Sequence, residues 1–285
     1  MNLRAKPPLF PSTSRGVGGC TDSKKAARSG APFWLIVALL LCVSAVCVSA
    51  FAAPAAAPAL GGVAPFGEGT IWTAAQDGNL GLVKRLLGQN PKLANARFVV
   101  GRGTPEPVDW TPLSLAAVAG KVEVAKFLLS KGATVNLRRG NGNTPLYDVV
   151  LWGGGSKNRL EVLSLLLSKG ANVNERTRAG FIPLDYARDA PVARLLLDLG
   201  AKINDYANVH GITPLQSVVK YSLPELSRTG KLPQGLSLIR LLALHHADLR
   251  HKDKAGKSAL DYARGLRDTA ARQKVSTLLL SLGAK

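Results

Sequence analysis

A repeated pattern fills the second part of the chain and restricts the folds that it can adopt. Its clearest copy runs from Thr111 to Asn136 and reads TPLSLAAVAGKVEVAKFLLSKGATVN. The copy predicts a short apolar helix, a glycine, a longer apolar helix that ends in two leucines, and a Gly-Ala pair. The position of Thr111 recurs at Gly69, Thr144, Ile182, Thr213 and Ser258. Six such copies predict a modular fold in which each unit packs on its neighbours in chain order.

Local signals place the helix ends of these units. Thr-Pro pairs at 111/112, 144/145 and 213/214 combine a hydroxyl cap with a ring already set to the helical φ, so each pair predicts a helix start. Glycines are expected to end the second helices in the left-handed conformation, at Gly132, Gly170, Gly200 and Gly283. His246 and Asn90 hold the same position in two other units. At His246 we expect the left-handed conformation of a residue with a side chain to lower the stability of the fold by about 1 kcal/mol.

The second helices are too apolar to stand alone. In the Thr111 unit the polar residues Glu123, Lys126 and Ser130 form one narrow stripe, and the remaining positions are almost all apolar. Glu161, Ser164 and Ser168 repeat that stripe. A helix that is apolar over so wide an arc must be covered on two sides, which a stack of neighbouring units achieves.

These features resemble the ankyrin repeat over residues 67–285. The spacings of the Thr111 position are 42, 33, 38, 31 and 45, against a family length of about 33. Extra residues lie between 97 and 109, around 154–158, and within 221–234. The resemblance implies an all-α solenoid of about six helix pairs with inter-repeat hairpin loops. It also implies protein binding through the hairpins and the inner helices. The histidine that often follows the TPL motif in the family is replaced at each unit: Ser114, Tyr147, Asp185, Gln216 and Asp261.

The region before the repeats predicts a membrane-targeting segment. Residues 1–32 are basic, rich in Pro, Gly and Ser, and without periodicity, so we expect a disordered leader. Residues 33–53 contain no charged side chain, and this segment is long enough for one transmembrane helix or a signal-peptide core. Residues 54–66 form an Ala/Pro-rich linker. Lys and Arg precede the apolar segment and are absent from 54–83, so the charge bias places the repeats outside the cytoplasm.

The sequence leaves open whether this segment stays attached. Ala50 and Ala52 each end a small-residue cleavage pattern, whereas the long basic leader favours an uncleaved anchor. The repeats are therefore expected on the periplasmic or extracellular side of a membrane, or free in the periplasm after cleavage. All three cysteines, Cys20, Cys42 and Cys47, precede the repeats. Packing alone must hold the repeat domain together.

The net charge of +19 suggests an acidic partner. Residues 51–285 still hold 31 basic and 17 acidic residues, so the leader does not account for the excess. One interpretation is that the cations only solubilise the outer surface. The other is that the hairpins carry a positive ridge for an acidic protein, lipid headgroups or a polyanion. The candidate protein-binding residues are Arg138, Arg139, Tyr147, Arg176, Arg178, Tyr206, Arg250, Lys252 and Lys254. Trp110 and Phe181 are expected to close the core beneath the turns.

The sequence does not predict catalysis or the binding of a cofactor. The four histidines do not form a metal pattern, no phosphate-binding loop or nucleophile elbow occurs, and the carboxylates are scattered. We expect no catalytic residues, no cofactor, no metal, no small-molecule substrate and no nucleic-acid ligand. The sequence predicts a non-catalytic protein–protein interaction module, exported or membrane-tethered, that binds an acidic protein partner. Two alternatives remain: an envelope scaffold that uses its inserts, or an accessory to an exported enzyme such as one that handles oxidative stress.

Overall fold

The computed structural model describes residues 69–100, 108–153 and 157–285, all within one compact unit of the chain. The predicted leader (1–32), transmembrane or signal segment (33–53) and linker (54–66) lie outside the described residues. Among the helices that are described, none is long and apolar enough to cross a membrane.

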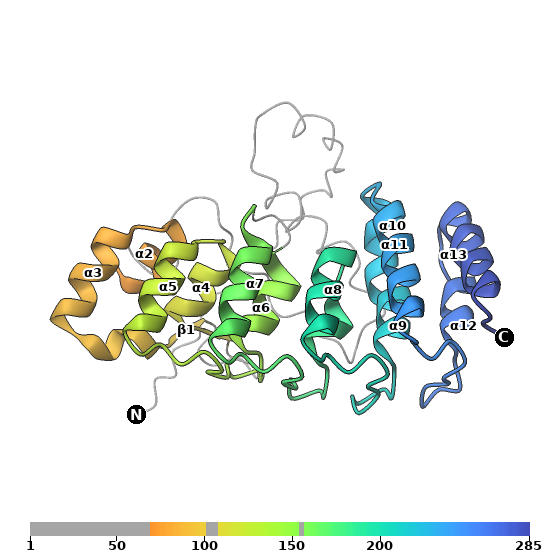
Figure 1. The fold of residues 1–285 in the computed structure, drawn as a ribbon, viewed down its shortest axis with the longest axis horizontal. Coiled ribbons are helices and arrows are strands. Elements are labelled where there is room, and N and C mark those ends of the chain that lie inside the picture. Colours follow the sequence, from red (N-terminus) through yellow and green to blue (C-terminus); the bar gives the residue numbers. More distant parts are fainter. Residues whose placement is uncertain (1–68, 101–107, 154–156) are drawn as a thin grey trace, which may run out of the picture. The chain divides into compact units, whose positions relative to one another are not determined.

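Six pairs of helices follow one another along the described chain, as the repeats predicted (Figure 1). Each pair consists of a first helical segment that follows a hairpin and a second helix that runs back. The pairs are α2 (Ile71–Asp77) with α3 (Leu80–Gln89), α4 (Pro112–Val118) with α5 (Val122–Ser130), α6 (Pro145–Trp152) with α7 (Arg159–Ser168), η4 (Pro183–Tyr186) with α8 (Ala190–Asp198), α9 (Pro214–Ser217), η5 (Val218–Ser222) and α10 (Leu223–Arg228) with α11 (Leu232–Leu244), and α12 (Ala259–Arg264) with α13 (Thr269–Ser281).

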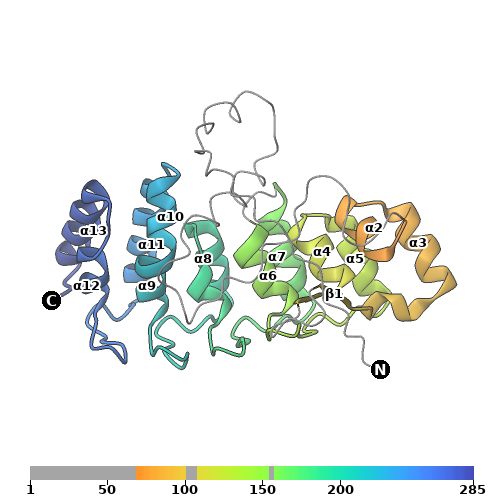
Figure 2. The ribbon, with the colours of Figure 1, turned by 180° about the vertical axis from the view of Figure 1, so that it is seen from behind.

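The helices form two layers, seen from opposite sides in Figures 1 and 2. First segments contact first segments: α2 with α4, α4 with α6, α6 with η4, η4 with α9, and η5 with α12. Second helices contact second helices in the same order, from α3 through α5, α7, α8 and α11 to α13. Each inner unit is therefore covered on two sides by its neighbours, which explains why the second helices carry such wide apolar faces.

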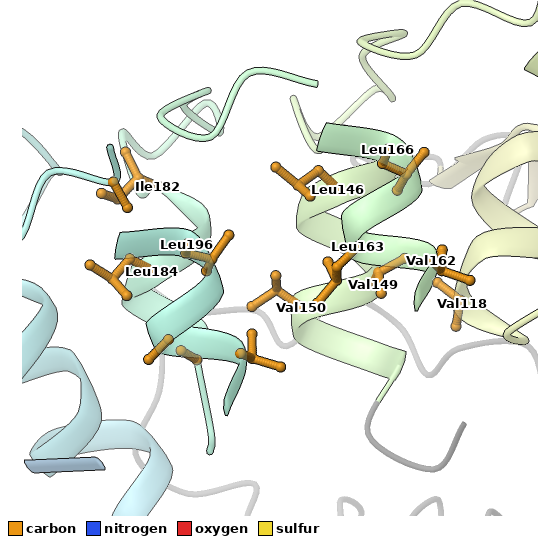
Figure 3. Close-up of a cluster of buried hydrophobic side chains, with 14 of the residues drawn as sticks. Val118, Leu146, Val149, Val150, Val162, Leu163, Leu166, Ile182, Leu184 and Leu196 are labelled. Carbon is orange, nitrogen blue, oxygen red and sulfur yellow. The ribbon is translucent and has the colours of Figure 1, made fainter. Parts of the chain in front are cut away.

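The core runs from unit to unit without a single centre. In Figure 3, Leu146 and Val150 of α6 and Leu163 of α7 lie between Val118 of the preceding unit and Leu184 of the following one. Except for Val118, at 8% exposure, these side chains are fully buried. Removing an inner unit would expose apolar side chains on both of its neighbours, so stability is shared along the stack.

The predicted caps are present. Thr111 accepts a hydrogen bond from the backbone N–H of Ser114 at 3.1 Å, and Thr213 accepts one from Gln216. The four predicted glycine caps have φ between 85° and 98°. His246 is left-handed as well, with φ 63°, and is the one non-glycine residue with positive φ in the described ranges. Asn90 is different: its backbone is extended, because it caps the 3-10 helix η2 (Pro91–Asn95) and its side chain accepts from Lys92 N–H.

Three features depart from a plain stack of α-helix pairs. The residues before the second unit form a small antiparallel sheet, in which β1 (Phe98–Val100) pairs with β2 (Val108–Trp110), so the repeat domain is not purely helical. The fourth unit begins with a 3-10 turn, η4, instead of an α-helix. The fifth unit has a long first segment from Pro214 to Arg228, which includes the π-helical turn η5. The extra residues within 221–234 therefore lengthen this segment and the turn after it.

A series of asparagines joins consecutive units, and sequence reasoning did not single it out. Asn136 donates to Gly170 O at 2.9 Å and accepts from Asn172 N–H at 3.0 Å. Asn95, Asn174 and Asn204 make the same two bonds to the next unit. The sequence does carry a signal for these asparagines, because Asn136, Asn174 and Asn204 each stand four residues after a cap glycine. These amides satisfy helix-end carbonyls that would otherwise lack a partner.

Candidate binding surface

The hairpins between units lie along one edge of the stack and are connected through their backbones (Figure 1). Arg178 N–H donates to Asn141 O at 3.3 Å, Val209 N–H donates to Ala179 O at 2.9 Å, and Lys254 N–H donates to His210 O at 3.1 Å. Two of these hairpins approach each other so closely that the tip of the first must be a glycine. A Cβ on Gly142, whose φ is 86°, would lie 2.6 Å from Arg178 N of the next hairpin. The hairpins thus form one continuous backbone platform for their side chains.

Three of the arginines predicted to face a partner are instead paired with carboxylates within the chain. Arg138 is exposed and forms an ion pair with Glu175 of the next hairpin. Arg176 is half-buried and binds Asp205 through two nitrogens, at 2.8 and 2.5 Å. These two pairs bridge successive hairpins and offset much of the positive charge that the sequence placed there. Their first role is to join units.

Arg139, the third of them, is a correction to the predicted surface. Its side chain is 2% exposed, and its guanidinium lies 2.7 Å from Asp148, which is fully buried. The same guanidinium donates to Asp109 O at 2.6 Å and lies 3.6 Å from the ring centre of Trp110. Burial raises the pKa of Asp148, and Arg139 opposes that rise. Arg139 therefore neutralises a core carboxylate and cannot contact a partner.

The aromatic predictions divide in the same way. Tyr147 is buried, with its ring centre 5.4 Å from that of Tyr186, so it is a core residue and not a contact residue. Tyr206 is 60% exposed at a hairpin and stacks on His251 at 5.1 Å. Trp110 and Phe181 are buried, as expected for residues that close the core.

The remaining candidates gather at the last three hairpins. Arg178, Arg250 and Lys252 are exposed, and none forms an ion pair within the described ranges. Lys254 is also exposed and donates from Nζ to Val209 O at 3.1 Å. Val209, which the sequence analysis did not select, is 53% exposed between these cations. We call this set the C-terminal hairpin ridge: Arg178, Tyr206, Val209, Arg250, Lys252 and Lys254.

The acidic side chains near the ridge offset only part of its charge. Residues 206–285 hold 13 basic and 5 acidic side chains, a net charge of +8. Each of the five carboxylates already has a structural partner: Glu225 pairs with Arg188, and Asp248, Asp253, Asp261 and Asp268 accept backbone N–H groups in turns and helix caps. The cations of the ridge are therefore left to solvent or to a ligand. Within the residues described, no three His, Cys, Asp or Glu side chains are grouped so as to hold a metal ion.

Comparison with known proteins supports the repeat architecture. Residues 71–177 match the family model for ankyrin repeats in three copies. A probable E3 ubiquitin-protein ligase, XBOS32 of Oryza sativa subsp. japonica, is 36% identical over 81 residues, which are 28% of this chain. This chain spans only 15% of the length of that relative.

Solved structures match most of the described region. An ankyrin repeat domain from Acinetobacter baumannii AYE is 25% identical with a TM-score of 0.57, over 75% of this chain and 98% of that one. The complex of the predatory endopeptidase Bd0816 from Bdellovibrio bacteriovorus with the immunity protein Bd3460 contains a chain that is 29% identical. Its TM-score is 0.56, and the match covers 74% of this chain and 96% of that one.

Proposed function

We propose that this chain, which contains ankyrin repeats, is a non-catalytic protein–protein interaction module that binds an acidic protein partner through its C-terminal hairpin ridge. The observation that carries the proposal is the exposure of Tyr206 and Val209 among cations that have no carboxylate partner in the described chain. A tyrosine and an apolar side chain surrounded by positive charge provide anchoring contacts together with electrostatic steering.

The mechanism is surface complementarity. Backbone hydrogen bonds between hairpins hold the backbones at Arg178, Val209 and Lys254 in fixed relative positions, so little backbone entropy is lost at the ridge on binding. The paired arginines Arg138 and Arg176 support the platform but contribute little net charge to a partner. An acidic segment that lies across the last three hairpins would meet Arg178 on one side of the Tyr206 and Val209 side chains and Arg250, Lys252 and Lys254 on the other.

A charge-reversal experiment tests this function. The double variant Lys252→Glu/Lys254→Glu is expected to abolish capture of the partner by the purified protein, with far-UV circular dichroism unchanged. The matched control is Arg240→Glu/Lys274→Glu, which makes the same change in net charge at exposed positions of α11 and α13. Equal capture by both variants, or equal loss in both, would reject the ridge as the binding surface.

The cellular location belongs to the same proposal and derives from the sequence alone. Residues 33–53 are proposed to target the repeats across a membrane, leaving them tethered to its outer face or released from it. The N-terminal residue of the mature protein from a native membrane fraction decides between the two. Met1 identifies an anchor, whereas Phe51 or Ala53 identifies cleavage.

The two alternatives predict different contact residues. A scaffold that uses its inserts would lose binding when 154–158 or 222–234 is deleted and would tolerate changes in the ridge. As an accessory to an exported enzyme, the chain would copurify with that enzyme. One chain of the complex between an endopeptidase and an immunity protein is similar to this chain, so that similar chain occurs in a protein–protein complex, which is consistent with a protein partner here.

A further inference from the structure

Lys220 occupies an irregular part of the fold, in the π-helical turn η5 of the fifth unit. The first segments of the other units are four to eight residues long, whereas this one continues from Pro214 to Arg228. A π turn places one additional residue in the helix and changes which side chains face the neighbouring unit; such turns are frequent at functional sites. Here it brings Lys220 and Tyr221 to face the last unit.

Aromatic rings hold the ammonium group of Lys220. Its Nζ lies 4.9 Å from the ring centre of Tyr221 and 5.0 Å from that of Tyr262 in α12. Both distances are within the range of a cation–π interaction. Neither ring can accept the three N–H hydrogens as an oxygen would. The side chain is half-buried, so its charge is partly removed from water.

The nearest carboxylate is already occupied by other donors. Asp253 accepts from Ala255 N–H and Lys257 N–H at 2.9 Å each through Oδ1, and from the Tyr262 hydroxyl through Oδ2. Asp253 supplies negative charge near Lys220 without forming an ion pair with it. Among the described residues, no oxygen accepts a hydrogen bond from the Lys220 ammonium.

A second ammonium group lies on the same ring. Lys257 Nζ is 5.8 Å from the ring centre of Tyr262. Burial lowers the pKa of Lys220, and Lys257 lowers it further, while Asp253 opposes both. Asp253 is one carboxylate beside the two ammonium groups of Lys220 and Lys257, and Lys254 of the hairpin ridge belongs to the same loop as Lys257.

We propose that Lys220, together with Lys257 and the rings of Tyr221 and Tyr262, forms a binding site for one carboxylate side chain of the partner protein. This inference rests on the proposed function and gives it a specific contact. A carboxylate would accept the ammonium hydrogens that no oxygen of the described chain accepts, and its methylene groups would pack on the tyrosine rings. It would also offset the repulsion between Lys220 and Lys257. The site lies on the first-segment layer, beside the ridge, so an acidic segment could occupy both.

The test uses hexaglutamate as the probe, with hexaglutamine and a single-stranded DNA of equal charge for comparison. Binding is measured by titration calorimetry, and acylation of Lys220 with and without probe is followed by mass spectrometry. Hexaglutamate is expected to bind and to protect Lys220. Lys220→Gln should weaken binding by about fivefold or more, whereas Lys220→Arg, which keeps the charge over the rings, should retain most of it. The matched control Arg240→Gln removes one charge from the second-helix layer and should have a smaller effect.

The outcomes separate this inference from the function on which it rests. If hexaglutamate binds and Lys252→Glu/Lys254→Glu abolishes binding, but Lys220→Gln behaves like Arg240→Gln, the ridge stands and the carboxylate site is refuted. Failure of hexaglutamate to bind, or to protect Lys220 while bound, also refutes the site. Tighter binding of DNA with the same dependence on Lys220 would overturn the assignment to a carboxylate. Capture of a partner that is lost in the ridge variant would still support the protein-binding function in each of these cases.

Discussion

The buried pair of Arg139 and Asp148 allows a strong test of how the units are held together. Arg139→Ala removes a guanidinium that lies 2.7 Å from a fully buried carboxylate, and leaves Asp148 with two uncharged side-chain donors, Asn143 Nδ2 at 3.3 Å and the Ser114 hydroxyl. Breaking a buried ion pair from one side costs about 3–5 kcal/mol, because the remaining charge stays in the core. The loss is large against a typical stability of about 5–15 kcal/mol.

The neighbouring residue provides the control. Arg138 also pairs with a carboxylate, but its side chain is 51% exposed. An exposed pair of this kind is worth about 0–1 kcal/mol, so Arg138→Ala should change stability little. Urea unfolding followed by circular dichroism compares the two variants. If Arg139→Ala shifts the midpoint no more than Arg138→Ala does, the buried pair does not contribute as argued.

The same reasoning fixes the pH dependence of the Arg139→Ala variant. Without Arg139, only burial and the weaker donors act on Asp148, so its folded pKa rises further above its unfolded value. A carboxyl group with a raised folded pKa favours the folded state at low pH, and this contribution is lost as the pH rises through the folded pKa. The loss of stability caused by Arg139→Ala should therefore be smaller at acid pH than at neutral pH. Adding Asp148→Asn should also recover part of it at neutral pH, and a deficit that grows in acid would contradict the assignment of the cost to a buried charge.

Two further predictions concern single residues. His246→Gly should raise the free energy of unfolding by about 1 kcal/mol, since His246 has φ 63°, whereas His245→Gly, at φ −90°, should lower it; a urea midpoint that falls in the first variant would refute the strain argument. Asp185→Asn should stabilise the protein near neutral pH and lose that advantage at acid pH. The reason is that burial holds the pKa of Asp185 well above its ordinary value. Asp205 raises this pKa too, whereas Ile182 N–H, Ser217 and Arg176 oppose the rise. Thermal unfolding at neutral and at acid pH measures the difference in stability between the variant and the wild-type protein. An equal shift of the melting temperature at the two pH values would exclude the carboxyl charge as the cause.

Helix boundaries could be predicted because their causes are local. A threonine hydroxyl, a proline ring and a cap glycine act within a few residues of themselves, and Thr111, Thr213 and Gly132 adopt the predicted roles. The replacement for the missing family histidine could not be predicted, because it depends on the next unit. Gln216 donates to His251 O at 3.0 Å and to Lys257 O at 2.8 Å, which fastens the fifth unit to the last hairpin. Nothing near Gln216 in the sequence indicates these partners.

The candidate surface was harder to predict, because a sequence gives the number of charges and not their pairing. Arg138 finds Glu175 and Arg176 finds Asp205 only when two hairpins are stacked. Tyr147 was misplaced for a similar reason: its ring is buried against Tyr186, whose position depends on the short turn η4 of another unit. Whether this aromatic side chain is exposed therefore depends on the next unit and not on its own sequence surroundings.

The carboxylates have different roles in the central and in the C-terminal units, and this difference affects which cations form ion pairs. In the central units, Glu175, Asp205 and Asp148 are placed to receive an arginine from the preceding or the same unit, and their charges cancel within the fold. Toward the C-terminus the carboxylates take a different role, since four of the five cap turns and helices through backbone N–H groups. A carboxylate used as a cap can still bind a cation, as Asp205 does when it accepts from Ala207 N–H and pairs with Arg176. In the described chain, however, the C-terminal caps form no ion pair with Lys220 or with the cations of the ridge, and the proposed acidic partner would supply carboxylates to them.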